Sequence, residues 1–407
     1  MGTLIKFELR KILGNRAGMV ACVLALALLS ALFLVNTLTY GTRDYFTGEY
    51  VEGLEAQMAN RALVESHAGQ LDDAHVAADA AALDRANELI GRTEGFYDMD
   101  SEQIIRTYGL EFWQQTMGTV NQHYYMEIVG TLDSHNPRAA SLEVGARDRV
   151  EAALVAGMNG NHPYSDAAKE YWRNKADAIE WPAEYGFAEC WNSMLDWGGF
   201  LSLVIVTMCI AISGVFAGEY QAGTAAIVLP TRRGKRTLPA AKVIAALVFA
   251  TCFWWLGAAV CLGVNLAVYG SDGWNLPFQA VEGFDNPYPL TVGQAVLLLY
   301  GLGWLVSLGM AALTLLLSAR LRSTMPVAVA PLAITFLGLL GLFSSLTDRI
   351  AALTPLSVLD YSFSRMVSYD VGSLVLDLPT LASILYALAL LVFVPLAMHA
   401  FKRHQVA

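Results

Sequence analysis

Six long apolar segments without a single Asp, Glu, Lys or Arg constrain this chain more than any other sequence feature. They are residues 17–38, 198–216, 243–268, 292–318, 326–346 and 380–398. A helix that crosses the hydrocarbon core of a bilayer needs roughly 20 mostly apolar residues, and the segments approach or exceed that length. Only 15% of the residues are charged, against roughly 25% in soluble domains. We therefore expect an all-α polytopic membrane protein with six transmembrane helices.

Basic residues between these segments predict the orientation, because short cytoplasmic loops are enriched in Lys and Arg. They cluster at the amino terminus, after the second segment, after the fourth and at the carboxyl end. The clusters are Lys6, Arg10, Lys11 and Arg16; Arg232, Arg233, Lys235, Arg236 and Lys242; Arg320 and Arg322; and Lys402 and Arg403. All four fall on one side of the membrane if both termini are cytoplasmic, which is our prediction.

This orientation places residues 39–197, between the first two segments, outside the cell. From Tyr40 to Asp196 the chain carries 27 acidic and 11 basic residues, a net charge of −16. Apolar residues at helical spacing predict helices near residues 71–89, 147–156 and 166–179. Cys190 has no cysteine partner in this region, so no disulfide is expected there. We predict a mainly helical extracellular domain.

The most informative motif lies in residues 217–242, between the second and third apolar segments. Here Glu219, Gly223, Thr224, Leu229 and Pro230 precede the basic run, and the stretch ends at Lys242. A short helix is expected from residue 217 to about 229, because Pro230 disfavours helical backbone in the residue before it. An ordinary positively charged loop accounts for the bases alone, whereas it leaves the order of the other residues unexplained.

This order resembles the type-2 permease family of ABC transporters, most of which are exporters. Such permeases carry an acidic residue, a Gly-Thr pair, a Leu-Pro end, an arginine and a lysine after the second span. The matching residues are Glu219, Gly223, Thr224, Leu229, Pro230, Arg232 or Arg233, and Lys242. Residues 1–16 are similar to the family's basic amphipathic helix and include Lys6, Phe7, Arg10 and Lys11. The stretch EYWRNKADAIEWPAEYGFAECW resembles a subset with a large extracellular domain.

The resemblance implies a permease subunit, not an enzyme, that exports a peptide, drug or lipid across a bacterial plasma membrane. Residues 217–242 and the amino-terminal helix would rest on a separate ATPase subunit, which would bind ATP and Mg²⁺. A second permease, identical or different, and membrane lipid are the other implied partners; nucleic acid is not. Glu219 would cap or bind a neighbouring helix, or remain a solvated carboxylate.

The chain itself lacks the motifs of nucleotide or metal chemistry. A phosphate-binding loop needs G-x-x-x-x-G-K-[ST], whereas Gly234-Lys235 is followed by Arg236 and Leu229 stands where the first glycine belongs. No HExxH or paired CxxC predicts a metal site, and no catalytic or cofactor residue is expected.

Three other classes of function compete with the permease. An ion-coupled transporter usually needs an ionisable residue within the membrane, and the six segments contain none. A membrane-anchored enzyme is disfavoured because neither HExxH nor G-x-S-x-G occurs. A non-transporting sensor, whose extracellular domain binds a ligand, stays open as the alternative.

Overall fold

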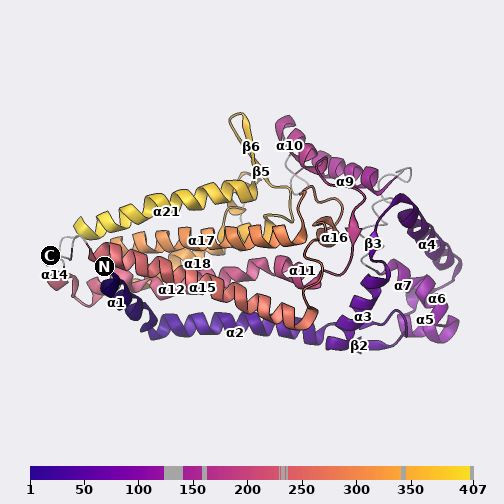
Figure 1. Cartoon of the computed structure of the whole chain (residues 1–407), viewed down its shortest axis with the longest axis horizontal. Coiled ribbons are helices and arrows are strands. Elements are labelled where there is room, and N and C mark those ends of the chain that lie inside the picture. The colour runs from indigo at the N-terminus through magenta and orange to yellow at the C-terminus, as the bar shows by residue number, and fades with distance from the viewer. Residues whose placement is uncertain are drawn as a thin grey trace.

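The computed structural model describes residues 1–122, 141–157, 163–228, 230, 234, 237–340 and 345–403. The predicted site residues Leu229, Arg232 and Arg233 lie outside this set, as does part of the expected fifth span. The described chain is mainly helical. An amino-terminal helix, α1 (Gly2–Leu13), precedes a bundle of long helices, and a set of shorter helices lies at the far end of that bundle (Figure 1).

Five helices within these residues are long and apolar enough to cross a membrane. They are α2 (Arg16–Thr39), the consecutive helical segments of Gly198–Gln221, α15 (Leu238–Tyr269), α17 (Val292–Arg320) and α21 (Leu378–Arg403). Each exceeds the roughly 20 residues that a hydrophobic crossing requires. The chain is therefore a multi-pass integral membrane protein, as its apolar segments predict, and the ends of most spans lie within a few residues of the predicted ones.

The five helices differ in how much of their surface the protein covers. Within the most apolar stretch of each, 67% of the residues of Gly198–Gln221 and 61% of those of α17 are buried, against 28% in α2 and 17% in α21. The first two therefore form the centre of the bundle, and α2 and α21 lie at its edges (Figure 1). Exposed side chains such as Leu24 and Leu391 give these outer helices apolar surfaces that suit lipid.

Small residues on α17 allow its neighbours to approach closely. A Cβ atom at Gly309 would lie 2.7 Å from Tyr386 of α21, and one at Gly303 would lie 2.3 Å from Trp254 of α15. Both distances are below any normal carbon contact. Glycine at these two positions therefore determines how tightly the helices pack, as small residues commonly do in membrane bundles.

The second span continues further than its apolar composition predicts. A 3₁₀ turn, η3 (Gly198–Leu201), leads into α12 (Ser202–Ile212) and α13 (Gly214–Gln221). The predicted end at residue 216 and the predicted helix 217–229 are therefore wrong. Helical hydrogen bonding continues past Phe216, the last residue of the apolar run, and a separate four-residue helix, α14 (Ala225–Val228), follows.

The predicted fifth span, 326–346, does not form one long helix. Its first part is α18 (Thr324–Thr335), an apolar helix of 12 residues that contains Pro331, and a 3₁₀ turn, η4 (Leu337–Leu340), follows. A helix of this length covers only about 18 Å at 1.5 Å per residue. Pro331 lacks the N–H group of an ordinary helical residue, but the helix continues four residues beyond it and ends at Thr335. Side chains on α18, including Met325 and Val329, are exposed like those of a lipid-facing helix.

The described part of the predicted extracellular domain is mainly helical, with one short hairpin and one pair of strands from distant parts of the chain. Its helices are α3 (Gly53–Ser66), α4 (Asp73–Arg92), α5 (Ser101–Tyr108), α6 (Leu110–Gln115), α7 (Met117–Val120), α9 (Leu142–Ala156), α10 (Asp166–Ala176) and α11 (Glu189–Asp196). The helices expected near residues 71–89, 147–156 and 166–179 correspond to α4, α9 and α10. Strands β1 (Gly41–Arg43) and β2 (Tyr50–Glu52) pair antiparallel, as do β3 (Gly69–Gln70) and β4 (Glu184–Tyr185).

Two hydrophobic cores divide this region. Ile90, Phe96, Ile104 and Trp113 form a small core that joins α4 to α5 and α6. Helices α9 and α10 instead bury Val150 and Trp172 in the core shared with the bundle. Helix α10 packs on β5 (Ser368–Val371), on β6 (Leu374–Asp377) and on the ring of Tyr288, in the loop before α17, whereas α5 and α6 lie at the far end of the molecule (Figure 1).

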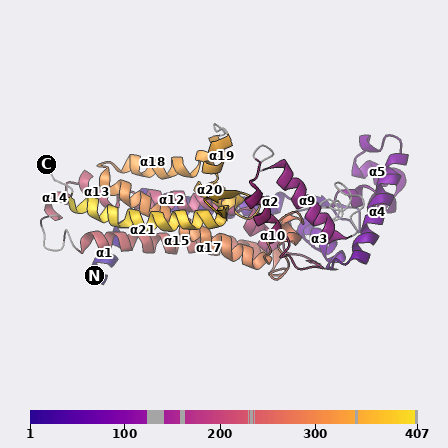
Figure 2. The same cartoon turned by 90° about the horizontal axis from the view of Figure 1, so that it is seen from above.

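The loops of the bundle carry the remaining elements. A short helix, α16 (Gln279–Glu282), lies between α15 and α17, and α19 (Ser345–Ala351) and α20 (Pro355–Tyr361) precede a hairpin of β5 (Ser368–Val371) and β6 (Leu374–Asp377). In Figures 1 and 2, α1 and the carboxyl end of α21 lie at one end of the bundle. The strands and helices of residues 41–197 lie at the opposite end.

Candidate functional site

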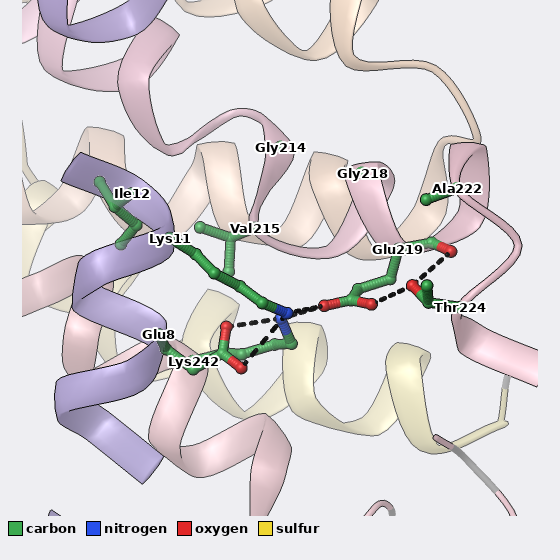
Figure 3. Close-up of a pocket in the computed structure, with 10 residues that line it drawn as sticks. All are labelled: Glu8, Lys11, Ile12, Gly214, Val215, Gly218, Glu219, Ala222, Thr224 and Lys242. Carbon is green, nitrogen blue, oxygen red and sulfur yellow. Dashed lines mark hydrogen bonds and ion pairs between the residues drawn. The ribbon is translucent and has the colours of Figure 1, made fainter. Parts of the chain in front are cut away.

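Four charged side chains from three elements meet beneath the amino-terminal helix. Glu8 and Lys11 come from α1, Glu219 from α13 and Lys242 from α15. The Nζ atoms of Lys11 and Lys242 each lie 2.8 Å from Oε1 of Glu219. Lys242 Nζ also lies 2.7 Å from Oε2 of Glu8. Figure 3 shows these side chains converging, and we refer to the four as the charge network.

The amphipathic pattern of α1 determines which of its residues enter the network. Glu8 and Ile12, one helical turn apart, are buried, whereas Lys6, Phe7 and Arg10 are exposed. Residues four positions apart share a helix face. The face with Glu8 and Ile12 therefore packs on the bundle, mainly against α15, and leaves a basic face with one aromatic ring open to its surroundings.

A turn after α13 adds a hydroxyl group to the network. Gly223 has a φ angle of +68°, a left-handed conformation that glycine adopts at little cost. The turn reverses the chain so that the hydroxyl of Thr224 donates a hydrogen bond to Oε2 of Glu219. The Gly-Thr pair thus places a neutral donor on the carboxylate oxygen that the lysines leave free.

Burial makes the charges of this network interdependent. Lys242 is 1% exposed, Glu8 4% and Glu219 8%, while the side chain of Lys11 is 45% exposed. Removing one partner of a buried ion pair costs about 3–5 kcal/mol, because the other charge remains without compensation. Two carboxylates facing two ammonium groups give a neutral cluster, so the three elements must stay together to avoid that cost.

A cavity of about 320 Å³ opens beside the network, between α1 and α13. Gly214 and Gly218, one turn apart on α13, line it together with Ala222, Ile12 and the charged residues (Figure 3). A Cβ atom added at Gly218 would meet no other atom within 4 Å. The small residues of α13 therefore leave space along the helix instead of sealing it against α1.

Known proteins offer no match to this chain. Protein-family models, curated proteins and solved structures were all compared with it, and none matches. The interpretation of the site therefore rests on its own geometry.

Several residues predicted from the sequence are brought together, and others are not. Glu219, Thr224, Lys242 and Lys11 lie in direct contact, although Lys11 and Glu219 are 208 positions apart. Pro230 is exposed and lies outside the network. Lys6, Phe7 and Arg10 are on the outer face of α1, where the side chain of Lys11 also passes 5.1 Å from the centre of the Phe7 ring.

Sequence reasoning missed Glu8, the second acid of the network. Its signal was present, since Glu8 is the one acidic residue of α1 and lies one turn before Ile12. A single acid on the apolar face of a basic helix indicates a buried cation on the partner element. Within the described ranges, no group of three or more His, Cys, Asp or Glu side chains is arranged to hold a metal ion.

Proposed function

We propose that this protein is the transmembrane permease subunit of an ATP-driven ABC transporter, and that it exports its substrate with energy from a separate ATPase chain. The charge network carries the proposal. It ties a surface helix, α1, to two membrane helices through buried ion pairs. A force applied to α1 by a partner would therefore reach α13 and α15 directly.

The exposed surface of α1 suits a protein or lipid partner with negative charge. Lys6, Arg10 and Phe7 project from it, and Phe7 is 55% exposed. An aromatic ring among basic residues provides an anchor of the kind that dominates protein interfaces. We assign this surface, with the loop after α13, to contact with the ATPase subunit, which supplies the ATP and Mg²⁺ chemistry.

The distribution of charge supports an orientation with α1 in the cytoplasm. Basic residues end α1, α17 and α21, and these three ends lie at the same end of the bundle (Figure 1). Basic residues favour the cytoplasmic side. Residues 41–197 would then be extracellular. Helix α1 and the carboxyl end of α21 lie at the same end of the bundle (Figure 1), which agrees with an even number of crossings. We therefore assign the fifth of six crossings to α18 and the turn after it.

A purification tests the proposal. The full-length protein is isolated in mild detergent from its native bacterial plasma membrane, and the accompanying chains are identified and assayed for ATP hydrolysis. We expect a stoichiometric ATPase subunit, with a second permease that is either another copy of this chain or a different one. Repeated isolation of the protein without any ATPase would contradict the proposal and favour a sensor.

A matched pair of variants locates the contact. The double substitution Lys6→Glu and Arg10→Glu reverses the exposed charges of α1 but leaves the charge network intact. It should reduce recovery of the ATPase at least tenfold at an unchanged level of permease. Lys402→Glu changes a basic residue on α21 at the same end of the bundle and should leave recovery unchanged. Equal recovery with both variants would remove α1 from the interface.

A further inference from the structure

A second cavity, of about 340 Å³, lies at the opposite end of the bundle from the charge network. It is enclosed by the end of α2, by α3, by the chain from β4 into α11, by the end of α15 and by α16. Its volume falls within the range of about 300–1,000 Å³ typical of small-molecule sites. Elements of both the bundle and residues 41–197 thus contribute to one recess.

The polar groups of this cavity include one carboxylate and several amides. Glu189 lines it and makes no ion pair with any residue that the structure describes. Gln57, on α3, is only 9% exposed and lines the cavity together with Asn60. The amide oxygens of these two side chains accept hydrogen bonds. They therefore suit a ligand that carries N–H groups.

Aromatic rings also line the cavity and add surfaces that attract cations. Tyr40, Tyr185 and Tyr269 line the cavity, the last two being nearly fully buried. The faces of such rings attract cations, most strongly where water is excluded. The guanidinium of Arg61 already packs against the neighbouring ring of Phe187, 5.1 Å from its centre. Arg61 is itself neutralised by Glu65 and Asp272, at 2.7 and 2.8 Å.

We propose that this cavity binds an organic cation, with its ammonium or guanidinium group on Glu189 and its N–H groups donating to the amide oxygens of Gln57 and Asn60. An anion would face Glu189 and the net charge of −16 between Tyr40 and Asp196. A purely apolar molecule would leave the amides without partners. A metal ion is disfavoured because the described residues hold no group of three metal-ligating side chains.

Protonation of Glu189 should control this binding. Burial, followed by the negative charge of Asp196, raises the pKa of Glu189 to about 7, although Asn192 lowers it in part. Glu282 on α16 titrates in the same range, since its pKa is also raised to about 7 by burial and nearby acids. Tyr40, Tyr185 and Cys190 stay uncharged there, because burial raises the pKa of each. The site therefore gains negative charge as pH rises from 5 to 8.

Equilibrium dialysis with radiolabelled agmatine, which carries a guanidinium and an ammonium group, tests the proposal. The full-length protein is used alone in neutral detergent at pH 8, so the result does not depend on any ATPase or on the proposed function. We expect saturable binding of one agmatine per chain that weakens at least tenfold at pH 5. The neutral analogue butylurea should bind at least tenfold more weakly. Absence of saturable binding, or equal binding of butylurea, would overturn the proposal.

Two substitutions and a control locate the site. Glu189→Gln should weaken agmatine binding at least tenfold, and Gln57→Leu, which keeps the side chain's size, at least threefold. Glu170→Gln removes an exposed acid from α10 and should leave binding unchanged. Binding as tight in both site variants as in the wild type would place agmatine elsewhere. The wild-type pH dependence remains decisive where a variant fails to fold.

Discussion

At the residue scale, neutrality explains how four ionic groups persist beside an apolar bundle. Glu8 and Glu219 carry two negative charges, and Lys11 and Lys242 carry two positive ones. The contacts of 2.7–2.8 Å are those of charge-assisted hydrogen bonds. Lys242 lies within 2.8 Å of both acids and is buried, whereas Lys11 lies 3.8 Å from Glu8 and is half-exposed, so the loss of Lys242 should lower stability more than the loss of Lys11.

A double-substitution cycle tests this arrangement. Lys242→Met leaves Glu8 and Glu219 sharing only Lys11, and we expect it to lower the free energy of unfolding by about 3–5 kcal/mol. Adding Glu219→Gln restores neutrality through the remaining Glu8 and Lys11, so the double variant should be more stable than Lys242→Met alone. Chemical denaturation in detergent measures both. Additive losses would show that the pair does not interact.

Glu282, at the end of the bundle far from the charge network, should make the stability of the protein depend on pH. Burial, with the charges of Asp196 and Asp285, raises the pKa of Glu282 from 4.5 to about 7. The folded protein therefore binds this proton more tightly than the unfolded chain, and this carboxylate reduces stability as pH rises from 4.5 to 7. Glu282→Gln should stabilise the protein above pH 7 by at most about 3 kcal/mol, since one pKa unit is worth about 1.4 kcal/mol.

Thermal unfolding between pH 4.5 and 8 measures the effect of Glu282→Gln. The advantage of the variant over the wild type should be absent at pH 4.5 and complete above pH 7. Glu170→Gln, which changes an exposed acid, serves as the control and should show no such trend. A constant difference across the whole range would mean that Glu282 does not titrate within it.

At the element scale, α10 is fastened to the hairpin that leads into α21. Lys175 on α10 lies 2.6 Å from Oδ2 of Asp377 and 4.0 Å from the centre of the Tyr288 ring. Ser165 and Trp172 of the same region bond to side chains of β5. Because β6 runs directly into α21, a movement of α10 would be passed to that membrane helix.

Lys175→Met tests this attachment. Asp377 is only 3% exposed, so removing its lysine leaves a buried negative charge and should lower the free energy of unfolding by about 3 kcal/mol. It should also speed proteolysis near α10. Lys169→Met, on the same helix, leaves the ion pair in place and should have little effect. Equal stability of the two variants would show that Lys175 does not fasten α10.

The sequence predicted what depends on composition and missed what depends on distant partners. The length of the apolar segments alone locates α2, α15, α17 and α21. A helix that crosses lipid needs roughly 20 apolar residues, whichever other helices it packs against. The contact between Glu8 and Lys242 joins residues 234 positions apart, and no local pattern encodes it. The predicted span end at Phe216 was wrong because helical hydrogen bonds continue to Gln221, beyond the last residue of the apolar run. The predicted fifth span is interrupted after Thr335, which hydropathy alone does not reveal.

At the scale of the whole molecule, the position of the β5–β6 hairpin distinguishes five crossings from six. If α18 and the turn after it cross the membrane, the hairpin lies on the same side as residues 41–197. If they do not cross, the hairpin lies on the same side as α1. Figure 1 places the hairpin at the end of α21 that is far from α1, which favours the first arrangement and so six crossings.

Cysteine labelling in intact bacterial cells tests this topology. Single cysteines are introduced by Phe7→Cys, Met58→Cys, Arg322→Cys and Leu374→Cys, all at exposed positions. The background carries Cys252→Ala, because Cys252 is the one exposed native cysteine and the other four are buried. With six crossings, a membrane-impermeant maleimide should label the variants at 58 and 374 in intact cells, and those at 7 and 322 only after permeabilisation. Protection of position 374 together with position 322 would mean that α18 turns back without crossing, since both sites would then share the cytoplasmic side.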